Sequence, residues 1–343
     1  MIKIELKDGS VKEVESGLSI LEIAKNISEG LARVATAGKI NGEVKDLRTI
    51  VNEDCKLEIL TFESCIDGKK AYWHTTSHIM AQAIKRLFPN VKLAIGPSID
   101  EGFYYDFDTE NPFSDEDKAK IEEEMKKIIK EDLQIERFSL PKNEALELMK
   151  DEPYKQELIK ELPEGEEISF YKQGDFTDLC AGPHLTSTGK VKAIKLLNSS
   201  AAYWRGDSSK ATLQRIYGIS FPKASQLEEH LKMLEEARSR DHNKLGRELE
   251  LFTTVDYIGQ GLPIMLPKGA KVIQILQRMV EDEEEKRGYL LTKTPFMAKS
   301  DLYKMFCEIK ADTRLEKARK LRDHIELKTY TKEKRSIFNM FKR

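Results

Sequence analysis

Two short motifs hold three of the six histidines of this 343-residue chain and one of its four cysteines. The first is His74-Thr-Thr-Ser-His78, whose spacing of four residues places both imidazoles on one face of a helix. The second is Cys180-Ala-Gly-Pro-His184, where Gly-Pro favours a turn, so the thiol and the imidazole project from one loop. Each motif alone is a weak signal, but together they predict a site, because the chain is otherwise poor in both residue types.

These four side chains suit two chemistries. Imidazole nitrogens and a thiolate are common ligands of tetrahedral zinc sites. Neutral imidazoles near physiological pH can also orient and deprotonate a water molecule for ester hydrolysis. The spacing alone does not separate a metal site from a hydrolytic site.

Periodicity predicts the elements that must position these motifs. Helices are expected over 75–87, over 115–132 and, as one highly charged segment, over 223–249. Alternating apolar residues in 2–6 and 55–60 predict the outer strands of a β-grasp-like unit. Within that unit, the run that begins Ser-Ile-Leu-Glu at Ser19 is typical of a helix start.

Composition indicates a cytoplasmic protein of several domains. The chain is too long for one ordinary core, and no run approaches the ~20 apolar residues of a membrane helix. Widely scattered cysteines favour reduced thiols over disulfides. The net charge of −2 argues against a uniformly basic nucleic-acid coat and leaves local RNA-binding patches open.

The longer motifs resemble threonyl-tRNA synthetases. The segments WHTTSHIMAQAIKRLFPN and DFTDLCAGPHLTSTGK are similar to the editing domain of that family. Residues 1–62 resemble its TGS domain. Residues 243–304, with LFTTVDYIGQGLPIMLPKGA, resemble the opening of its class II catalytic domain. Because several long motifs recur in the family's order, the resemblance is specific.

The resemblance implies an α+β multidomain fold. The expected parts are a TGS-like β-grasp domain (1–62), an α+β editing domain of the threonyl/alanyl-tRNA synthetase type (63–222), a helical connector (223–242), an incomplete class II catalytic fragment with the motif 1 region (243–304), and a divergent charged tail (305–343).

In the family the editing pocket uses both motifs, and the chemistry of their side chains suggests a role for each of them here. His74 or His78 would position the hydrolytic water, while Cys180 and His184 would hold the ester end and the terminal ribose of the tRNA. Threonyl-type pockets work without bound metal, whereas related alanyl-type domains bind zinc there. Whether a metal binds these four side chains therefore stays open.

Four further positions match the family's pocket. Asp178 would fix an imidazole tautomer or the substrate amine, and Lys155 would help to hold the RNA end. Tyr104 and Tyr171 match substrate-binding positions.

The expected activity is hydrolysis of mischarged seryl-tRNA(Thr). A threonine pocket discriminates against serine by only about 1–3 kcal/mol, so a second site must remove the error. The expected partner is the acceptor end of tRNA(Thr), with no DNA and no membrane. A homodimer through the motif 1 region, around Pro295, is a further expectation.

The family's ligase reaction uses ATP with Mg²⁺ and a zinc ion held by one cysteine and two histidines. The resemblance stops near Lys304, before motifs 2 and 3 and the zinc ligands, so we expect these sites to be absent and editing to require no cofactor. Three alternatives remain: a threonine–tRNA ligase fragment completed by a partner, a non-catalytic tRNA-binding module, and a decayed gene product.

Overall fold

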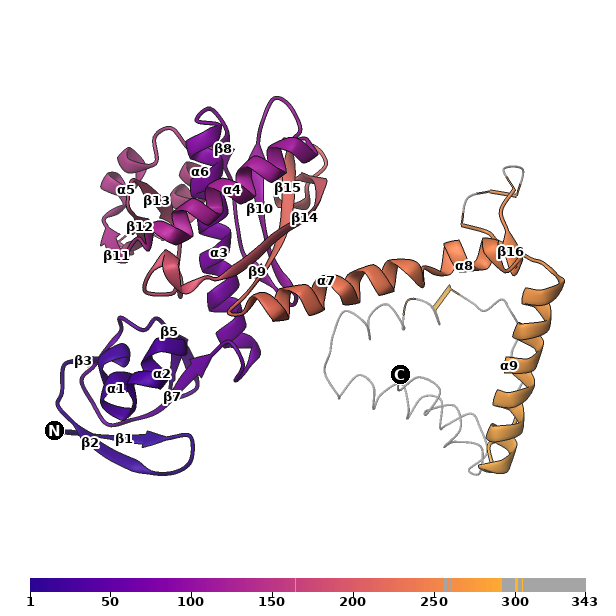
Figure 1. Ribbon diagram of the computed structural model, residues 1–343, viewed down its shortest axis with the longest axis horizontal. Helices are drawn as coiled ribbons and strands as arrows, with labels where there is room; N and C mark the ends of the chain where they lie inside the picture. Colours follow the sequence, from indigo (N-terminus) through magenta and orange to yellow (C-terminus); the bar gives the residue numbers. More distant parts are fainter. Residues whose placement is uncertain (164, 256–257, 260, 292–299, 302–303, 305–343) are drawn as a thin grey trace. The chain divides into compact units, whose positions relative to one another are not determined.

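A computed structural model describes residues 1–163, 165–255, 258–259, 261–291, 300–301 and 304. The chain divides into two units, residues 1–235 and 236–343. Figure 1 labels the helices and strands of the described residues. The predicted motif 1 proline, Pro295, and the predicted tail 305–343 lie outside the described residues.

The N-terminal part of the first unit is a small mixed sheet with two helices. Its strand order is β2-β1-β7-β4-β5, in which β1 and β7 pair in parallel and the other neighbours pair antiparallel. The elements are β1 (Ile2–Leu6), β2 (Val11–Val14), β3 (Leu18–Ser19), α1 (Ile20–Ile27), α2 (Glu29–Val34), β4 (Ala35–Ile40), β5 (Glu43–Lys45), β6 (Ile50–Val51) and β7 (Cys55–Thr61). Ile4, Ile20 and Leu57 lie at the centre of its core.

Helix α1 begins where the sequence predicts. The hydroxyl of Ser19 accepts from the amide of Glu22 at 3.2 Å, and the Glu22 carboxylate accepts from the Ser19 amide at 2.8 Å. This reciprocal capping box satisfies two amides that have no partner within the helix.

The long helix α3 (Ile66–Leu87) is buried along most of its length and contacts α4 (Asp115–Glu131), β10 (Gly102–Asp108) and β4. It begins earlier than the predicted 75–87. A Cβ at Gly68 would lie 2.1 Å from the Thr61 carbonyl oxygen, so only glycine allows α3 to approach β7 this closely.

A second sheet, of order β14-β15-β10-β8, packs against α3 and α4. Its other strands are β8 (Lys92–Leu93), β9 (Ser98–Ile99), which pairs with β10, β14 (Ala193–Tyr203) and β15 (Thr212–Phe221); the short 3-10 helices η1 (Thr188–Lys190) and η2 (Trp204–Gly206) flank β14. Phe103, Tyr105 and Phe107 alternate along β10 and are all 0% exposed, so one face of this strand faces the helices.

A third sheet, β11-β12-β13, carries the strand that leads to the second motif. The elements are β11 (Ile135–Leu140), α5 (Lys142–Leu148), α6 (Pro153–Glu161), β12 (Ile168–Gln173) and β13 (Phe176–Leu179). A tight turn joins β12 to β13 through Gly174, which has φ +61°. Cys180 follows β13 directly, so the register of this hairpin sets the position of the thiol.

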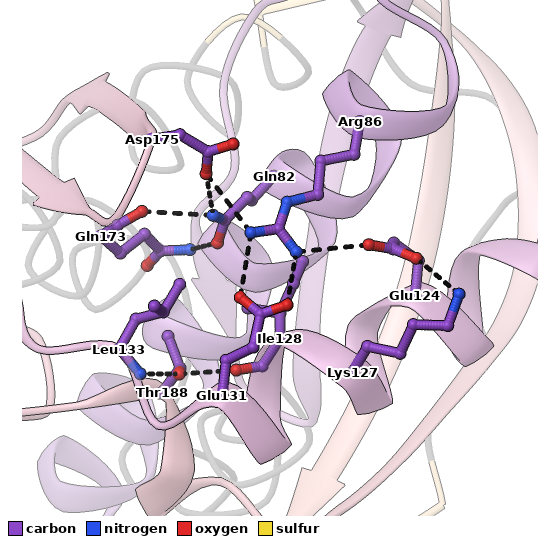
Figure 2. A network of polar contacts seen from close by, with 10 residues as sticks. All are labelled: Gln82, Arg86, Glu124, Lys127, Ile128, Glu131, Leu133, Gln173, Asp175 and Thr188. Carbon is purple, nitrogen blue, oxygen red and sulfur yellow. Dashed lines mark hydrogen bonds and ion pairs between the residues drawn. The ribbon is translucent and has the colours of Figure 1, made fainter.

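A polar network fixes α3 against α4 and this hairpin (Figure 2). The Arg86 guanidinium donates to both carboxylate oxygens of Glu131, at 2.9 and 3.0 Å, and lies 3.4 Å from Asp175. Nε2 of Gln82 donates to the backbone carbonyl of Gln173 at 3.2 Å and to Asp175 at 2.8 Å, and Nε2 of Gln173 donates to Oε1 of Gln82 at 2.8 Å. The bidentate geometry favours one register of the two helices.

The charged segment predicted as one helix over 223–249 forms two helices, which corrects the prediction. Helix α7 (Ala224–Ser239) ends, and α8 (His242–Glu248) begins at Asp241, whose carboxylate accepts from two amides of the new first turn at 3.0 Å each. Aspartate competes for backbone donors in this way, so the chain restarts instead of continuing.

Among its described residues, the second unit contains α8 and then β16 (Phe252–Thr253), β17 (Ile264–Met265) and α9 (Pro267–Lys286). Among the described residues, no helix combines the length and the apolar character that a membrane span requires.

Replacing Arg86 with methionine removes the central donor of the network in Figure 2. We expect the free energy of unfolding to fall by about 1–2 kcal/mol, because the carboxylates of Glu131, Glu124 and Asp175 lose their shared partner. Both tryptophans, Trp73 and Trp204, lie in the first unit, so fluorescence-monitored urea unfolding measures this change. Lys120→Met, at an exposed site on α4, is the control, and an equal loss there would contradict the assignment.

Candidate functional site

The structure brings the two predicted motifs together. Helix α3 carries His74 and His78 one turn apart, and the loop after β13 carries Cys180 and His184. One ligand atom from each residue lies within 4.8 Å of the others. The four side chains therefore form one cluster, which we call the His/Cys cluster.

Cys180 links the two motifs. Its sulfur lies 3.3 Å from Nε2 of His74 and 3.2 Å from Nε2 of His184. Its backbone is held on both sides, because its amide donates to the Ser169 carbonyl at 3.1 Å and its carbonyl accepts from the Ser169 hydroxyl at 2.6 Å. The side chain of Cys180 thus extends from a backbone that is fixed at the end of β13.

The turn predicted from Gly182-Pro183 is present and requires glycine. Gly182 has φ +77°, and its amide donates to the Cys180 sulfur at 3.2 Å. A Cβ at this position would lie 2.1 Å from the hydroxyl of Tyr171. The peptide bond between Gly182 and Pro183 is cis. This turn brings His184 back over the thiol.

Thr75 sets the tautomer of His184. Its hydroxyl donates to the Ala71 carbonyl at 2.9 Å and accepts from the Leu185 amide at 2.9 Å, while Nδ1 of His184 lies 3.3 Å from the same oxygen. The single hydroxyl proton is used on Ala71, so the imidazole must donate from Nδ1. Its Nε2 is then an acceptor that faces the thiol of Cys180.

Burial keeps the cluster neutral. It lowers the pKa of His74 to about 3 and that of His78 to about 4, and it lowers the pKa of His184 well below the usual value. Neighbouring imidazoles lower the pKa of His74 and His184 further. Burial also raises the pKa of Cys180 to about 12. Three neutral imidazoles and a protonated thiol therefore face one another at pH 7.

A buried ion pair lies behind the cluster. Nζ of Lys155 is 2.6 Å from Oδ1 of Asp178, and the hydroxyl of Tyr105 donates to Oδ2 at 2.7 Å. Nε2 of His78 lies 3.7 Å from that same oxygen. Burial raises the pKa of Asp178, but Lys155 and its other partners outweigh this effect and hold the pKa below its usual value. Asp178 is thus an anion beside His78.

The two predicted tyrosines lie in different surroundings. The ring of Tyr171 is 4.4 Å from that of His184, so it borders the cluster. Tyr104 points to the opposite face of β10 from Tyr105, where its ring lies 3.7 Å from the guanidinium carbon of Arg215. The structure does not bring Tyr104 to the cluster, and its role in substrate binding stays a prediction.

Three residues at the site were not predicted. Tyr105 shares a face with two buried phenylalanines of the same strand, so strand periodicity could have identified it. Thr75 gives no signal beyond its place between the two histidines. Asp46, from the N-terminal sheet, accepts hydrogen bonds from Tyr171 and from the His184 amide, and no local pattern indicates this.

The cluster fits a metal ion by donor type. Tetrahedral zinc sites have Zn–S and Zn–N distances of about 2.3 and 2.0–2.1 Å, which place neighbouring ligand atoms about 3.3–3.6 Å apart. The sulfur–nitrogen distances of 3.2 and 3.3 Å are close to this range. They equally fit thiol–imidazole hydrogen bonds. His74, His78, Cys180 and His184 are the residues that would hold such an ion.

Two protein-family models match the chain. The TGS domain matches residues 2–61, and the threonyl and alanyl tRNA synthetase second additional domain matches residues 168–217, which include Cys180 and His184.

Several curated proteins named threonine–tRNA ligase are also similar. The chain is 67% identical over 305 residues to the Clostridium perfringens protein, covering 89% of this chain and 47% of that one. It is 65% identical over 305 residues to a Clostridium botulinum protein, with the same coverage, and 60% identical over 303 residues to a Caldanaerobacter subterraneus protein, covering 88% and 47%. The chain thus spans about half the length of the curated relatives it matches. These matches confirm the resemblance to threonyl-tRNA synthetases and to their TGS and editing domains.

The buried histidines predict a pH dependence of stability in metal-free protein. The folded pKa of His78, about 4, lies below its usual 6.5, so the unfolded chain binds more protons between these values. Stability is therefore full above pH 6.5 and falls as pH drops towards 4. At pH 5 the loss from one such histidine is on the order of 2 kcal/mol.

His78→Gln should flatten this dependence, as measured by urea unfolding at pH 7.5 and 5.0 in the presence of a chelator. His242→Gln, at an exposed position, is the matched control and should leave the dependence unchanged. Equal slopes for the wild type and His78→Gln would contradict the neutral, buried state.

Proposed function

We propose that the first unit hydrolyses mischarged seryl-tRNA(Thr). The observation that carries this proposal is the convergence of four side chains, from two motifs about 100 residues apart, into one neutral His/Cys cluster. A match to the threonyl and alanyl tRNA synthetase second additional domain over the second motif supports it. The expected ligand is the aminoacylated 3′ end of the tRNA.

The chemistry is ester hydrolysis. Water attacks the carbonyl carbon of the serine ester, the bond to the ribose oxygen breaks, and serine and the free tRNA hydroxyl leave, each with one proton from water. The residues His74 and Cys180 are half-buried, whereas His78 and His184 are buried. In this proposal the substrate therefore approaches the cluster from the side of His74.

The imidazoles act by positioning water. Efficient general bases have a pKa near the working pH, and a pKa of about 3 or 4 makes His74 and His78 weak bases. A neutral imidazole nonetheless accepts a hydrogen bond from water and orients it towards the carbonyl carbon. Besides the imidazoles, a hydroxyl of the substrate's own ribose is a candidate for accepting the proton that the attacking water loses.

The Lys155–Asp178 pair has a different place in this proposal. Both groups are buried and use each other as partners, so Lys155 contacts the RNA end only if substrate displaces it from Asp178. We assign Asp178 to orienting His78, whose Nε2 is 3.7 Å away. Cys180 and His184 are left to hold the ester end and the terminal ribose.

A second candidate function is threonine–tRNA ligation. It is favoured by the 67% identity to a protein named threonine–tRNA ligase, of which the chain spans 47%. In that case this chain works as a ligase, alone or completed by a partner, and the expected homodimer and cytoplasmic location follow the ligase. Threonine-dependent ATP–pyrophosphate exchange catalysed by this chain alone would support ligation and contradict a purely editing role.

The double variant His74→Ala with His78→Ala should lose at least about 100-fold in the rate of seryl-tRNA(Thr) hydrolysis, because no group remains on α3 to orient water. The measurement is release of labelled serine under single-turnover conditions. His242→Ala is the control and should retain the wild-type rate. Unchanged hydrolysis in the double variant would refute the assignment.

Metal removal should leave hydrolysis unchanged. In the proposed reaction the imidazoles themselves orient the water, so no step passes through an ion. We expect less than a twofold change in rate after dialysis against a chelator, with zinc content measured by mass spectrometry. A loss of activity that zinc restores would instead place a metal on the His/Cys cluster.

A further inference from the structure

A loop of the N-terminal sheet reaches the His/Cys cluster. Asp46 follows β5, and its side chain is buried against the second motif. One carboxylate oxygen, Oδ2, accepts from the hydroxyl of Tyr171 at 3.0 Å and from the backbone amide of His184 at 3.1 Å. A side chain from outside the matched editing segment thus holds the residue that carries one imidazole of the cluster.

Arg48 holds the same loop through hydrogen bonds to its backbone carbonyl groups. Its guanidinium lies 2.8 Å from Oδ1 of Asp46 and donates to the carbonyl of Leu185 at 2.8 Å, to that of His184 at 3.4 Å, and to that of Ile135. The Arg48 amide also donates to Oδ1 of Asp46 at 2.9 Å. Asp46 and Arg48 are therefore one hydrogen-bonded unit, which we call the 46/48 clamp.

The 46/48 clamp completes the constraints on His184. The backbone amide and carbonyl are held by Asp46 and Arg48, Nδ1 is held by Thr75, and one ring face is covered by Tyr171, whose hydroxyl is also fixed by Asp46. Each constraint limits the rotation of the imidazole. Removing the clamp frees the backbone, and an error of about 1 Å in such a group costs up to ~100-fold in rate.

We infer that Asp46 and Arg48 are positioning residues for the His/Cys cluster, so that the N-terminal domain is part of the editing machinery. This inference rests on the proposed hydrolysis. The contacts of the clamp run to Tyr171 and to the loop of His184, so its effect on the reaction passes through these residues.

The test uses the full chain with Asp46→Ala, Asp46→Asn, Arg48→Met and Arg48→Lys. Asp54→Ala and Arg33→Met, at exposed positions of the same N-terminal domain, are the matched controls. We expect Asp46→Ala and Arg48→Met to lower kcat for seryl-tRNA(Thr) hydrolysis at least about tenfold with less than about a threefold change in KM. Loss in kcat without loss in KM distinguishes misplacement of His184 from loss of tRNA binding.

The conservative variants test the contacts individually. The side-chain carbonyl of an asparagine at this position would still accept from Tyr171 and the His184 amide, but the ion pair with Arg48 would be lost. Asp46→Asn should therefore fall between wild type and Asp46→Ala. A lysine cannot reach the three carbonyls at once, so Arg48→Lys should recover only part of the activity. The double variant Asp46→Ala with Arg48→Met should be no worse than about the poorer single variant, because both act as one unit.

A second readout is independent of hydrolysis. Releasing the loop should raise the rate of Cys180 alkylation by iodoacetamide at least about threefold, measured by peptide mass spectrometry, with Cys55 as the internal reference. Thermal melting identifies variants that fail to fold, and for those the milder asparagine and lysine variants decide. If the wild type does not hydrolyse seryl-tRNA but alkylation still rises, the proposed function fails and the clamp stands. If kcat and alkylation match the controls in every folded clamp variant, the clamp inference is wrong.

Discussion

The site depends on the burial of helix α3. This helix is enclosed by the second sheet, by α4 and by the N-terminal domain, so the imidazoles of His74 and His78 lie in a medium that disfavours charge. Their neutral state follows from this enclosure more than from any direct partner. Neutral imidazoles can accept hydrogen bonds, and they can lie within contact distance of each other and of a thiol without repulsion. The same burial makes the cluster dependent on every element that excludes water from it.

The charge pair between Lys155 and Asp178 shows how costly this environment is. Separating Lys155 from Asp178 in the interior would leave an uncompensated charge, a change that typically costs about 3–5 kcal/mol. Their contact of 2.6 Å compensates the charge of the carboxylate, and the Tyr105 hydroxyl donates to its other oxygen. The pair also sets the electrostatic potential at His78. Its presence explains why a lysine, otherwise typical of surfaces, lies in the core of this domain.

Two sets of polar contacts hold the cluster from outside. The network around Arg86 fixes α3 relative to α4 and to the β12–β13 hairpin, and so fixes the helix that carries one motif (Figure 2). The 46/48 clamp fixes the loop that carries the other. Neither set touches the reacting atoms proposed here. Both hold the two motifs in place, so that the Cys180 sulfur lies 3.2–3.3 Å from Nε2 of His74 and of His184.

The sequence by itself determined the local features: the helical spacing of His74 and His78, the glycine-dependent turn before His184, the capped start of α1, and the resemblance to threonyl-tRNA synthetases. These follow from backbone periodicity and turn chemistry, which act over a few residues. Only the tertiary structure decided that the motifs meet, that Tyr105 rather than Tyr104 faces Asp178, and that Asp46 reaches His184. Packing between distant segments sets these contacts and the burial that lowers the histidine pKa values, and no local pattern of residues encodes it.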